Sequence, residues 1–255
     1  MKNMFRISGI ILLILSVFLI HSCKKDKTKE ETPLKTTITP GTLSDIDGNV
    51  YKTITIDDHN HNAVTWMAAN LKTTRYSNGD LVGTTNPVTL DIRNMDEPSY
   101  QWPVGNDESN VATYGRLYTW YVVSDLNQKR NVCPTAWHVS TRGDWTSLNN
   151  IMQVKNVGND PNSTDNGGRL KEIGTTHWET PNLGATDEIG FSALPAGWRY
   201  CNNFSNGDPG TIGDHGYWWV NDSGWCYSID YSTAELTMMY INSPKSGLSI
   251  RCVKN

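Results

Sequence analysis

Positive charge is scarce in this sequence. Lys and Arg number 22 against 26 Asp and Glu, which gives a formal net charge of −4 and a pI of about 5.8. The chain has no basic stripe and no alternation of Arg with aromatic residues, the patterns by which a nucleic-acid-binding surface is recognised. We therefore expect no nucleic-acid partner.

Motifs of catalysis and metal binding are also lacking. No Cys-x-x-Cys pair occurs, and residues 190–194 lack the second Gly of a nucleophile elbow. Asp187 and Glu188 are adjacent and would point in different directions, so they do not form a paired acid site. His59 and His61 could be half of a metal site, but no third ligand has matching spacing and a solvated loop is the simpler interpretation. The sequence therefore predicts no enzyme and no cofactor.

Residues 1–22 have the pattern of a signal peptide. Lys2 and Arg6 form a positive start, and residues 10–20 are almost wholly apolar, a run too short to span a bilayer with its flanks. A small residue then precedes Cys23, as in a lipobox, which predicts cleavage before Cys23 and its acylation. The alternatives are an ordinary signal peptide with an incidental Cys, or an uncleaved anchor. Acyl chains on Cys23 would make a lipid membrane the first partner.

Residues 23–44 contain mixed charge, several Thr and no aromatic side chain. Such a segment buries too little apolar surface to fold. We expect a flexible tether that begins at the acylated Cys23, although its Lys-rich start could also contact anionic headgroups.

Residues 45–255 are one domain by length. The chain contains ten Trp and eleven Tyr against four Phe, and a domain of this kind needs most of its Trp for the core. Residues 50–56 alternate as a strand, and residues 63–67 return as the second strand of a hairpin. Glycine recurs along residues 169–253, which favours short strands joined by long loops.

Two helices are expected near the middle of the chain. Residues 115–124 have an aromatic-rich helical pattern, and Pro134 argues against helix in the connector that follows. Thr141 and Asp144 have the spacing of a capping box. An apolar stripe of Trp145, Leu148, Ile151 and Met152 follows that cap and predicts a short amphipathic helix.

The motifs around these helices resemble those of the Fibrobacter succinogenes major paralogous domain. The main ones are YGRLYTWY from Tyr114, CPTAWHVSTRGDW from Cys133, GGRLK from Gly167, GFSALPAG from Gly190 and SIRCVK from Ser249. The resemblance covers about residues 45–255. It implies an α+β, C-type-lectin-like fold, related to the sulfatase-modifying factors, in which two short helices pack on twisted antiparallel β-sheets with long loops. Ser140 and Asp144 replace the usual Pro and Glu of the helix start.

Four cysteines remain after Cys23, and an even number in an exported chain suggests disulfides with three possible connectivities. The resemblance implies a Cys133–Cys252 bridge, which joins the connector after the first helix to the last strand. We also predict a Cys201–Cys226 bridge across loop-rich sequence. A metal or redox site is the alternative.

The segment from Tyr217 to Trp225 holds the densest group of candidate ligand-binding residues. Flat aromatic faces and fixed polar groups are what sugar recognition needs. The candidates are Trp178, Trp218, Trp219, Asn221, Asp222 and Trp225. Alternation would bury one of Trp218 and Trp219, whereas Trp178 and Trp225 are expected to be the most exposed.

Calcium is the one metal for which the sequence offers candidates. Asn221 and Asp222 are loosely similar to the calcium-binding Trp-Asn-Asp of sugar-binding lectins, with one residue inserted after Trp219. Residues 156–168 are also rich in oxygen ligands, but they lack the closing Glu of an EF-hand and turn chemistry explains them. Calcium at Asn221 and Asp222 is therefore the one exception to the expected absence of a cofactor.

These observations predict a lipoprotein of the cell envelope, anchored in the outer membrane and facing the periplasm or the surface. Its domain would bind glycan or protein ligands through the long-loop face. A structural or adhesive scaffold without sugar binding is one alternative. A Cys-oxidising enzyme is another, and it would require Cys201 and Cys226 to be free, close together and exposed.

Overall fold

The computed structural model describes residues 37–57, 63–124, 130–152, 163–201, 212–222 and 224–255. The chain divides into Met1–Pro33 and Leu34–Asn255, and every described residue lies in the second unit. Cys23, His59, His61 and most of residues 156–168 fall outside the described residues, so the predictions made for them stay predictions. None of the helices in the described ranges is long and apolar enough to cross a membrane.

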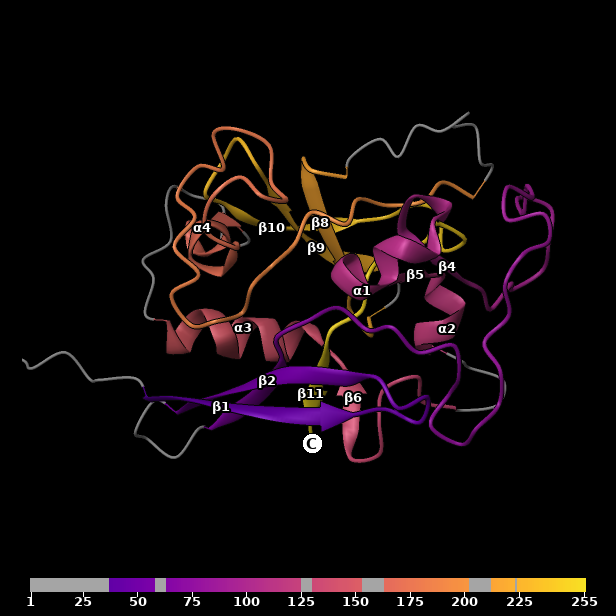
Figure 1. The fold of residues 1–255 in the computed structure, drawn as a ribbon, viewed down its shortest axis with the longest axis horizontal. Coiled ribbons are helices and arrows are strands. Elements are labelled where there is room, and N and C mark those ends of the chain that lie inside the picture. The colour runs from indigo at the N-terminus through magenta and orange to yellow at the C-terminus, as the bar shows by residue number, and fades with distance from the viewer. Residues whose placement is uncertain (1–36, 58–62, 125–129, 153–162, 202–211, 223) are drawn as a thin grey trace, which may run out of the picture. The chain divides into compact units, whose positions relative to one another are not determined.

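The first sheet has five antiparallel strands in the order β1-β2-β3-β11-β6 (Figure 1). They are β1 (Thr37–Ser44), β2 (Val50–Asp57), β3 (Val64–Met67), β11 (Cys252–Lys254) and β6 (Trp137–Val139). The predicted hairpin of residues 50–56 and 63–67 is confirmed as β2 and β3. The last strand of the chain lies between β3 and β6, so both halves of the sequence contribute to this sheet.

Strand β1 corrects the predicted tether. It pairs with β2 along its whole length, from Thr37 opposite Asp57 to Ser44 opposite Val50. The prediction of a flexible segment is therefore wrong for residues 37–44. The composition argument failed because β1 needs no core: nearly all of its residues are exposed, and the backbone ladder to β2 holds it.

The second sheet has four antiparallel strands in the order β7-β10-β9-β8. They are β7 (Ser163–Thr164), β10 (Leu236–Tyr240), β9 (Trp225–Asp230) and β8 (His215–Trp219). A third, two-stranded pair joins β4 (Gln101–Pro103) to β5 (Arg116–Tyr118).

The helices are short. They are α1 (Val111–Tyr114), α2 (Trp120–Ser124), α3 (Arg142–Ile151) and α4 (Asn166–Leu170), with 3-10 turns at Val104–Asn106 and Glu108–Asn110. The prediction of one helix over residues 115–124 is right only from Trp120 onward. Gly115 has a positive φ of 77°, and residues 116–118 pair with β4, so the chain enters the helix from a strand.

The capping box of α3 is present as predicted. The Thr141 hydroxyl accepts from the Asp144 amide at 3.2 Å, and the Asp144 carboxylate accepts from the Thr141 amide at 2.7 Å. Trp145, Leu148 and Ile151 are buried between the two main sheets, against Ile54 of β2 and Ile229 of β9 among others. Figure 1 shows α3 lying between β1–β2 and β9–β10. We call this apolar cluster the first core.

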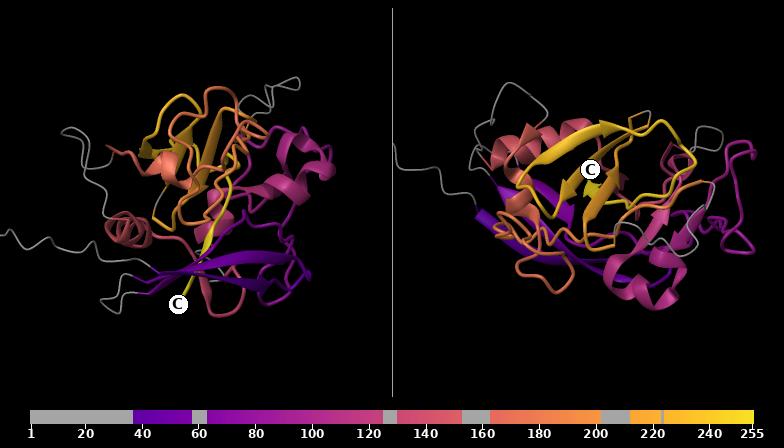
Figure 2. Two further views of the ribbon diagram at one scale, coloured as in Figure 1. Left: turned by 60° about the vertical axis from the view of Figure 1, so that its left-hand side comes forward. Right: turned by 90° about the horizontal axis from the view of Figure 1, so that it is seen from above.

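A second core lies across β8 and β11 from the first, since Trp219 and Cys252 belong to it whereas Trp218 and Val253 belong to the first. It contains Tyr118, Val122, Trp219 and the Cys133–Cys252 disulfide, which has an S–S distance of 1.98 Å and a Cα–Cα distance of 5.9 Å. The predicted bridge is thus confirmed, and it ties the connector after α2 to β11. Figure 2 shows the C-terminal segment running from the region of the second sheet to the first. Mostly antiparallel sheets with a few short helices make this an α+β domain.

Candidate ligand-binding surfaces

Trp218 and Trp219 are adjacent in β8, and both are fully buried. Trp218 packs in the first core and donates from Nε1 to Oδ1 of Asn70 at 2.9 Å. Trp219 faces the opposite side of the strand, packs in the second core, and donates from Nε1 to the backbone oxygen of Tyr118 at 2.7 Å. We expected only one of them to be buried. Both are, because β8 separates the two cores, and neither ring is accessible to a ligand.

The expectation that Trp178 is exposed is wrong. It is 2% exposed and belongs to the first core. Its Nε1 donates to the backbone oxygen of Ala193 at 2.9 Å, and Nζ of Lys171 lies 5.4 Å from the ring centroid. A Trp that satisfies its polar group inside the protein and packs against a buried cation is part of the core.

Asn221 and Asp222 dock the turn between β8 and β9 onto the start of α3. The Asn221 amide donates to the Ser140 oxygen at 2.9 Å, and Oδ2 of Asp222 accepts from the Arg142 amide at 3.0 Å. The Asp222 carboxylate therefore faces the positive end of a helix. One oxygen of Asp222 thus serves the helix start, and calcium at Asn221 and Asp222 stays a prediction. Within the described ranges, no group of three or more His, Cys, Asp or Glu could hold a metal ion.

Trp225 is the only one of the four predicted Trp candidates that reaches the surface. It is half-buried, and its ring lies edge-on to that of Tyr240, with the centroids 5.5 Å apart. Tyr240 is 56% exposed, and the guanidinium of Arg142 lies 5.1 Å from the Trp225 ring centroid. Asn221 is exposed on the turn that precedes Trp225. We call Trp225, Tyr240, Arg142 and Asn221 the Trp225 surface.

Sequence reasoning missed a second surface, on one face of the sheet that contains β8, β9 and β10. The strand register places His215 and Tyr217 of β8, Ser228 and Asp230 of β9, and Thr237 and Met239 of β10 on the same face. Trp219 and Cys226 lie at one end of that face and are buried, whereas the residues just named are half-buried or exposed. We call this part the open sheet face.

Two further rings border the open sheet face. The segment with Trp198 and Tyr200 runs beside β8, since the Gly197 amide donates to the His215 oxygen at 2.8 Å. The signal for this surface was present in the sequence. Trp198 and Tyr200, like His215 and Tyr217, are two residues apart, which places both members of a pair on one face of an extended segment.

The prediction of a Cys201–Cys226 disulfide is wrong, since both cysteines are free. Cys226 is fully buried in the second core, and burial raises the pKa of its thiol to about 12. Cys201 is half-buried, and its Sγ lies 3.4 Å from the Ser243 hydroxyl. The Cys201 backbone oxygen accepts from the Ile92 amide, so the main chain at Cys201 is bonded to the segment around Ile92.

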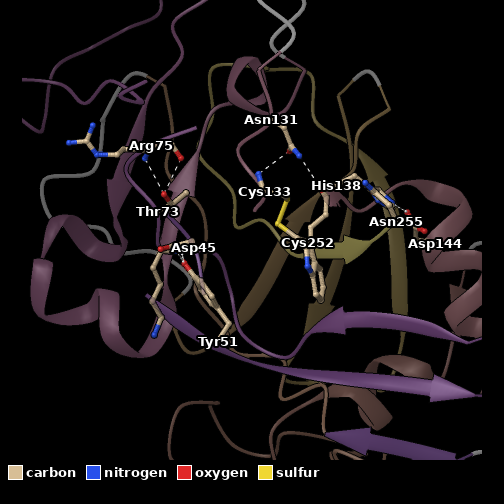
Figure 3. Close-up of a disulfide and its surroundings, with 12 residues drawn as sticks. Asp45, Tyr51, Thr73, Arg75, Asn131, Cys133, His138, Asp144, Cys252 and Asn255 are labelled. Carbon is tan, nitrogen blue, oxygen red and sulfur yellow. Dashed lines mark hydrogen bonds and ion pairs between the residues drawn. A yellow bond between two sulfur atoms is a disulfide. The ribbon is translucent and has the colours of Figure 1, made fainter. Parts of the chain in front are cut away.

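A pocket of about 320 Å³ lies beside the confirmed disulfide and is lined by Asp45, Thr73 and Cys133 among others. The two polar side chains just named already have partners in the protein. The Asp45 carboxylate accepts from the Tyr51 hydroxyl and the Asn49 amide, and the Thr73 hydroxyl donates to Asp47. Figure 3 shows Asp45, Tyr51 and Thr73 on one side of the disulfide and His138 on the other, with Asn131 above it. The pocket therefore presents no clear set of groups for a ligand.

The carboxylates singled out as a possible acid pair have separate partners. Asp187 accepts from the amide and the hydroxyl of Ser192 at 2.7 and 2.8 Å, whereas Glu188 forms an ion pair with Arg169. They point to different neighbours, as the sequence suggested.

The fold and these surfaces define a disulfide-tied α+β domain that presents aromatic side chains on the Trp225 surface and along the open sheet face. A family model for the Fibrobacter succinogenes major domain matches residues 60–254. The chain belongs to that family, as its motifs implied. No curated protein matches the chain, and no solved structure does.

Proposed function

We propose that this protein is a membrane-anchored binding module of the cell envelope. In this proposal Cys23 is acylated after removal of residues 1–22, and the lipid holds the domain at the outer membrane, facing the periplasm or the surface. The domain is C-type-lectin-like and takes a glycan or protein ligand without catalysing a reaction. The motif around Cys23 supports export and anchoring, and the Cys133–Cys252 disulfide fits an oxidising compartment.

The Trp225 surface carries the binding part of the proposal. Trp225 and Tyr240 offer two partly uncovered rings in contact, and Arg142 and Asn221 supply polar groups beside them. Rings with a polar neighbour are the usual anchors of binding surfaces, because they bury much area at little cost in conformational entropy. Asp222 is needed for the helix start, so we propose binding that does not depend on calcium.

An array of glycans and proteins probed with residues 34–255 would test this proposal, because both cores lie within that fragment. We expect a ligand whose binding falls at least tenfold in Trp225→Ala and in Tyr240→Ala. Tyr121→Ala, which removes a half-buried ring of α2, serves as the matched control and should bind as the wild type does. Equal binding by all variants, or no ligand on the array, would count against the Trp225 surface.

The anchor is tested separately. Metabolic labelling with an alkyne fatty acid should mark the full chain and not its Cys23→Ala variant, which should also leave the membrane fraction. Labelling that survives this substitution would remove the lipoprotein proposal.

A structural or adhesive scaffold without sugar binding differs from this proposal only in its ligand. Binding to the proteins of the array and to none of its glycans would identify that alternative. A Cys-oxidising enzyme is less well supported. Although Cys201 and Cys226 are free, a thiol as deeply buried as Cys226 does not form a reactive thiolate at neutral pH.

A further inference from the structure

The rings on and beside the open sheet face form a continuous row. Tyr200 and Trp198 have centroids 4.2 Å apart, Trp198 and Tyr217 are 5.8 Å apart, and Tyr217 and His215 are 5.5 Å apart. The first two pairs are tilted by 53° and 35°, so those rings do not cover one another face to face. Tyr200 is 47% exposed, and the other three are half-buried. His215 and Tyr217 are nearly parallel, at 7°, and Trp198 and Tyr217 pack partly against the second core. The row therefore presents the Tyr200 ring and the uncovered parts of the other three rings.

Hydroxyl and carboxylate groups lie along this row. Asp230 accepts from Nε2 of His215 at 2.8 Å, and Asp214 lies 3.8 Å from Nδ1 of the same ring. Ser228 and Thr237 occupy the neighbouring strands of the same face. The end of the row near His215 thus holds two carboxylates that are each about 30% exposed. Negative charge there disfavours an anionic ligand.

The same geometry argues against a peptide as the occupant. An added strand would need an open edge, but the outer edge of β8 is already bonded to Gly197 and Ser249. A peptide that adds a strand is therefore disfavoured, whereas rings with hydroxyls and carboxylates beside them match the C–H faces and hydroxyls of a saccharide.

We propose that the open sheet face, with Trp198 and Tyr200, is a binding site for a saccharide chain that carries no negative charge. Sugar rings lie against the aromatic row through their C–H faces, and their hydroxyls bond to the carboxylates and hydroxyls beside it. The site is separate from the Trp225 surface, so it does not depend on the function proposed above.

The test uses a panel of hexasaccharides and NMR of the fragment 34–255. Six hexamers in the panel carry no negative charge: β-1,4-linked, β-1,3-linked and α-1,4-linked glucose, β-1,4-linked mannose, N-acetylglucosamine and glucosamine. Guluronate hexamer is the anionic member. We expect at least one of the first six to shift the indole N–H signal of Trp198, and its disaccharide to bind at least tenfold more weakly. Guluronate should bind at least tenfold more weakly than the best of these six. The proposal fails if no member shifts that signal at 10 mM, or if guluronate binds best.

Variants then place the ligand. Tyr200→Ala and Trp198→Ala should each weaken the bound hexamer at least tenfold, whereas Tyr200→Phe, which keeps the ring, should bind within twofold of the wild type. Trp225→Ala should leave this affinity unchanged, which separates this site from the Trp225 surface. Because Tyr200 is largely exposed, its substitution tests the site even if Trp198→Ala does not fold. Binding that is equal in Tyr200→Ala and wild type would overturn the proposal.

Asp214→Asn gives a second readout. Loss of this charge should improve the binding of guluronate relative to the neutral hexamer by several-fold. An unchanged ratio would show that the carboxylate does not face the ligand, and would overturn the charge selectivity proposed here.

Discussion

Arg251 donates from Nε to Oδ1 of Asn70 at 3.0 Å, and both side chains are buried. The same oxygen accepts from the Trp218 indole, so one amide connects Arg251, the residue before β11, to β8. The other guanidinium nitrogens donate to the backbone oxygens of Met67, Phe191 and Ser192. The guanidinium also lies 4.2 Å from the ring centroid of Phe191. A buried charge satisfied in this way joins three distant parts of the chain.

Arg251→Leu should therefore destabilise the domain severely. It leaves several buried acceptors without donors, each at a cost of about 1–3 kcal/mol, so we expect a loss of at least about 3 kcal/mol. Urea unfolding of residues 34–255 measures this. The control is Arg93→Leu, which removes a surface ion pair with Asp91 and should cost less than about 1 kcal/mol. Similar losses in the two variants would contradict the role given to Arg251.

The Cys133–Cys252 disulfide closes a loop with a sequence separation of 119. In the chain-entropy model, Cys133→Ala with Cys252→Ala should lower the free energy of unfolding by about 4–5 kcal/mol. Reduction of the wild type by dithiothreitol should have the same effect, and Cys201→Ala, the control, should still respond to reduction. A wild type whose stability is insensitive to dithiothreitol would contradict the bridge.

Thiol titration of the unreduced fragment 34–255 distinguishes the two free cysteines. Cys201 is half-buried and should react with Ellman's reagent in the folded protein. Cys226 should react only after unfolding, because it is buried and its pKa is raised to about 12. Two fast thiols would instead revive the enzyme alternative, and none would indicate that the two cysteines are bridged.

Asp222→Ala tests whether this residue serves the helix or a metal. Loss of its bond to the Arg142 amide should cost about 1 kcal/mol, as for other caps. The loss should be the same in calcium and in a chelator. Asp165→Ala is a matched control, since Asp165 precedes α4 without a side-chain capping bond and should have little effect. A calcium-dependent difference at Asp222 would contradict the capping role.

Lys171 should make stability depend on alkaline pH. Its Nζ donates to the backbone oxygens of Asp230 and Thr233, and burial lowers its pKa from 10.5 to about 8. Between these values the unfolded chain binds more protons than the folded one. Stability contributed by this group therefore rises with pH across that window, by at most about 1.4 kcal/mol per unit.

The comparison of wild type with Lys171→Met isolates this effect. From pH 8 to 10.5 the free energy of unfolding should increase in the wild type relative to the variant, as followed by urea unfolding at each pH. Lys254→Met, at an exposed position, should follow the wild type. A wild type that loses stability relative to Lys171→Met over this range would contradict the prediction.

Strand β1 should be the least protected strand of the first sheet. Because its side chains are almost all exposed, its amides should exchange with deuterium earlier than those of β3 and β11. Residues 45–255 should still fold, with a loss of less than about 2 kcal/mol relative to residues 34–255, because both cores stay intact. A fragment that fails to fold would mean that β1 is part of the cooperative unit.

The sequence alone determined the features that depend on neighbours along the chain or on the family motifs. Thr141 and Asp144 formed the expected cap, and residues 50–67 the expected hairpin, since capping and strand pairing at short range follow from local spacing. The motifs also placed the Cys133–Cys252 bridge. These signals predicted where elements begin and which of their faces is apolar.

Only the tertiary structure decided which surfaces remain open. A sequence pattern shows that one face of a strand is apolar, but not whether a second core covers the other face, as it does at Trp219. It did not show that Trp178 would turn inward or that residues 37–44 would pair with β2. The row from Tyr200 to His215 arises where two extended segments lie side by side. Such a surface depends on contacts between segments distant in sequence, which local periodicity does not encode.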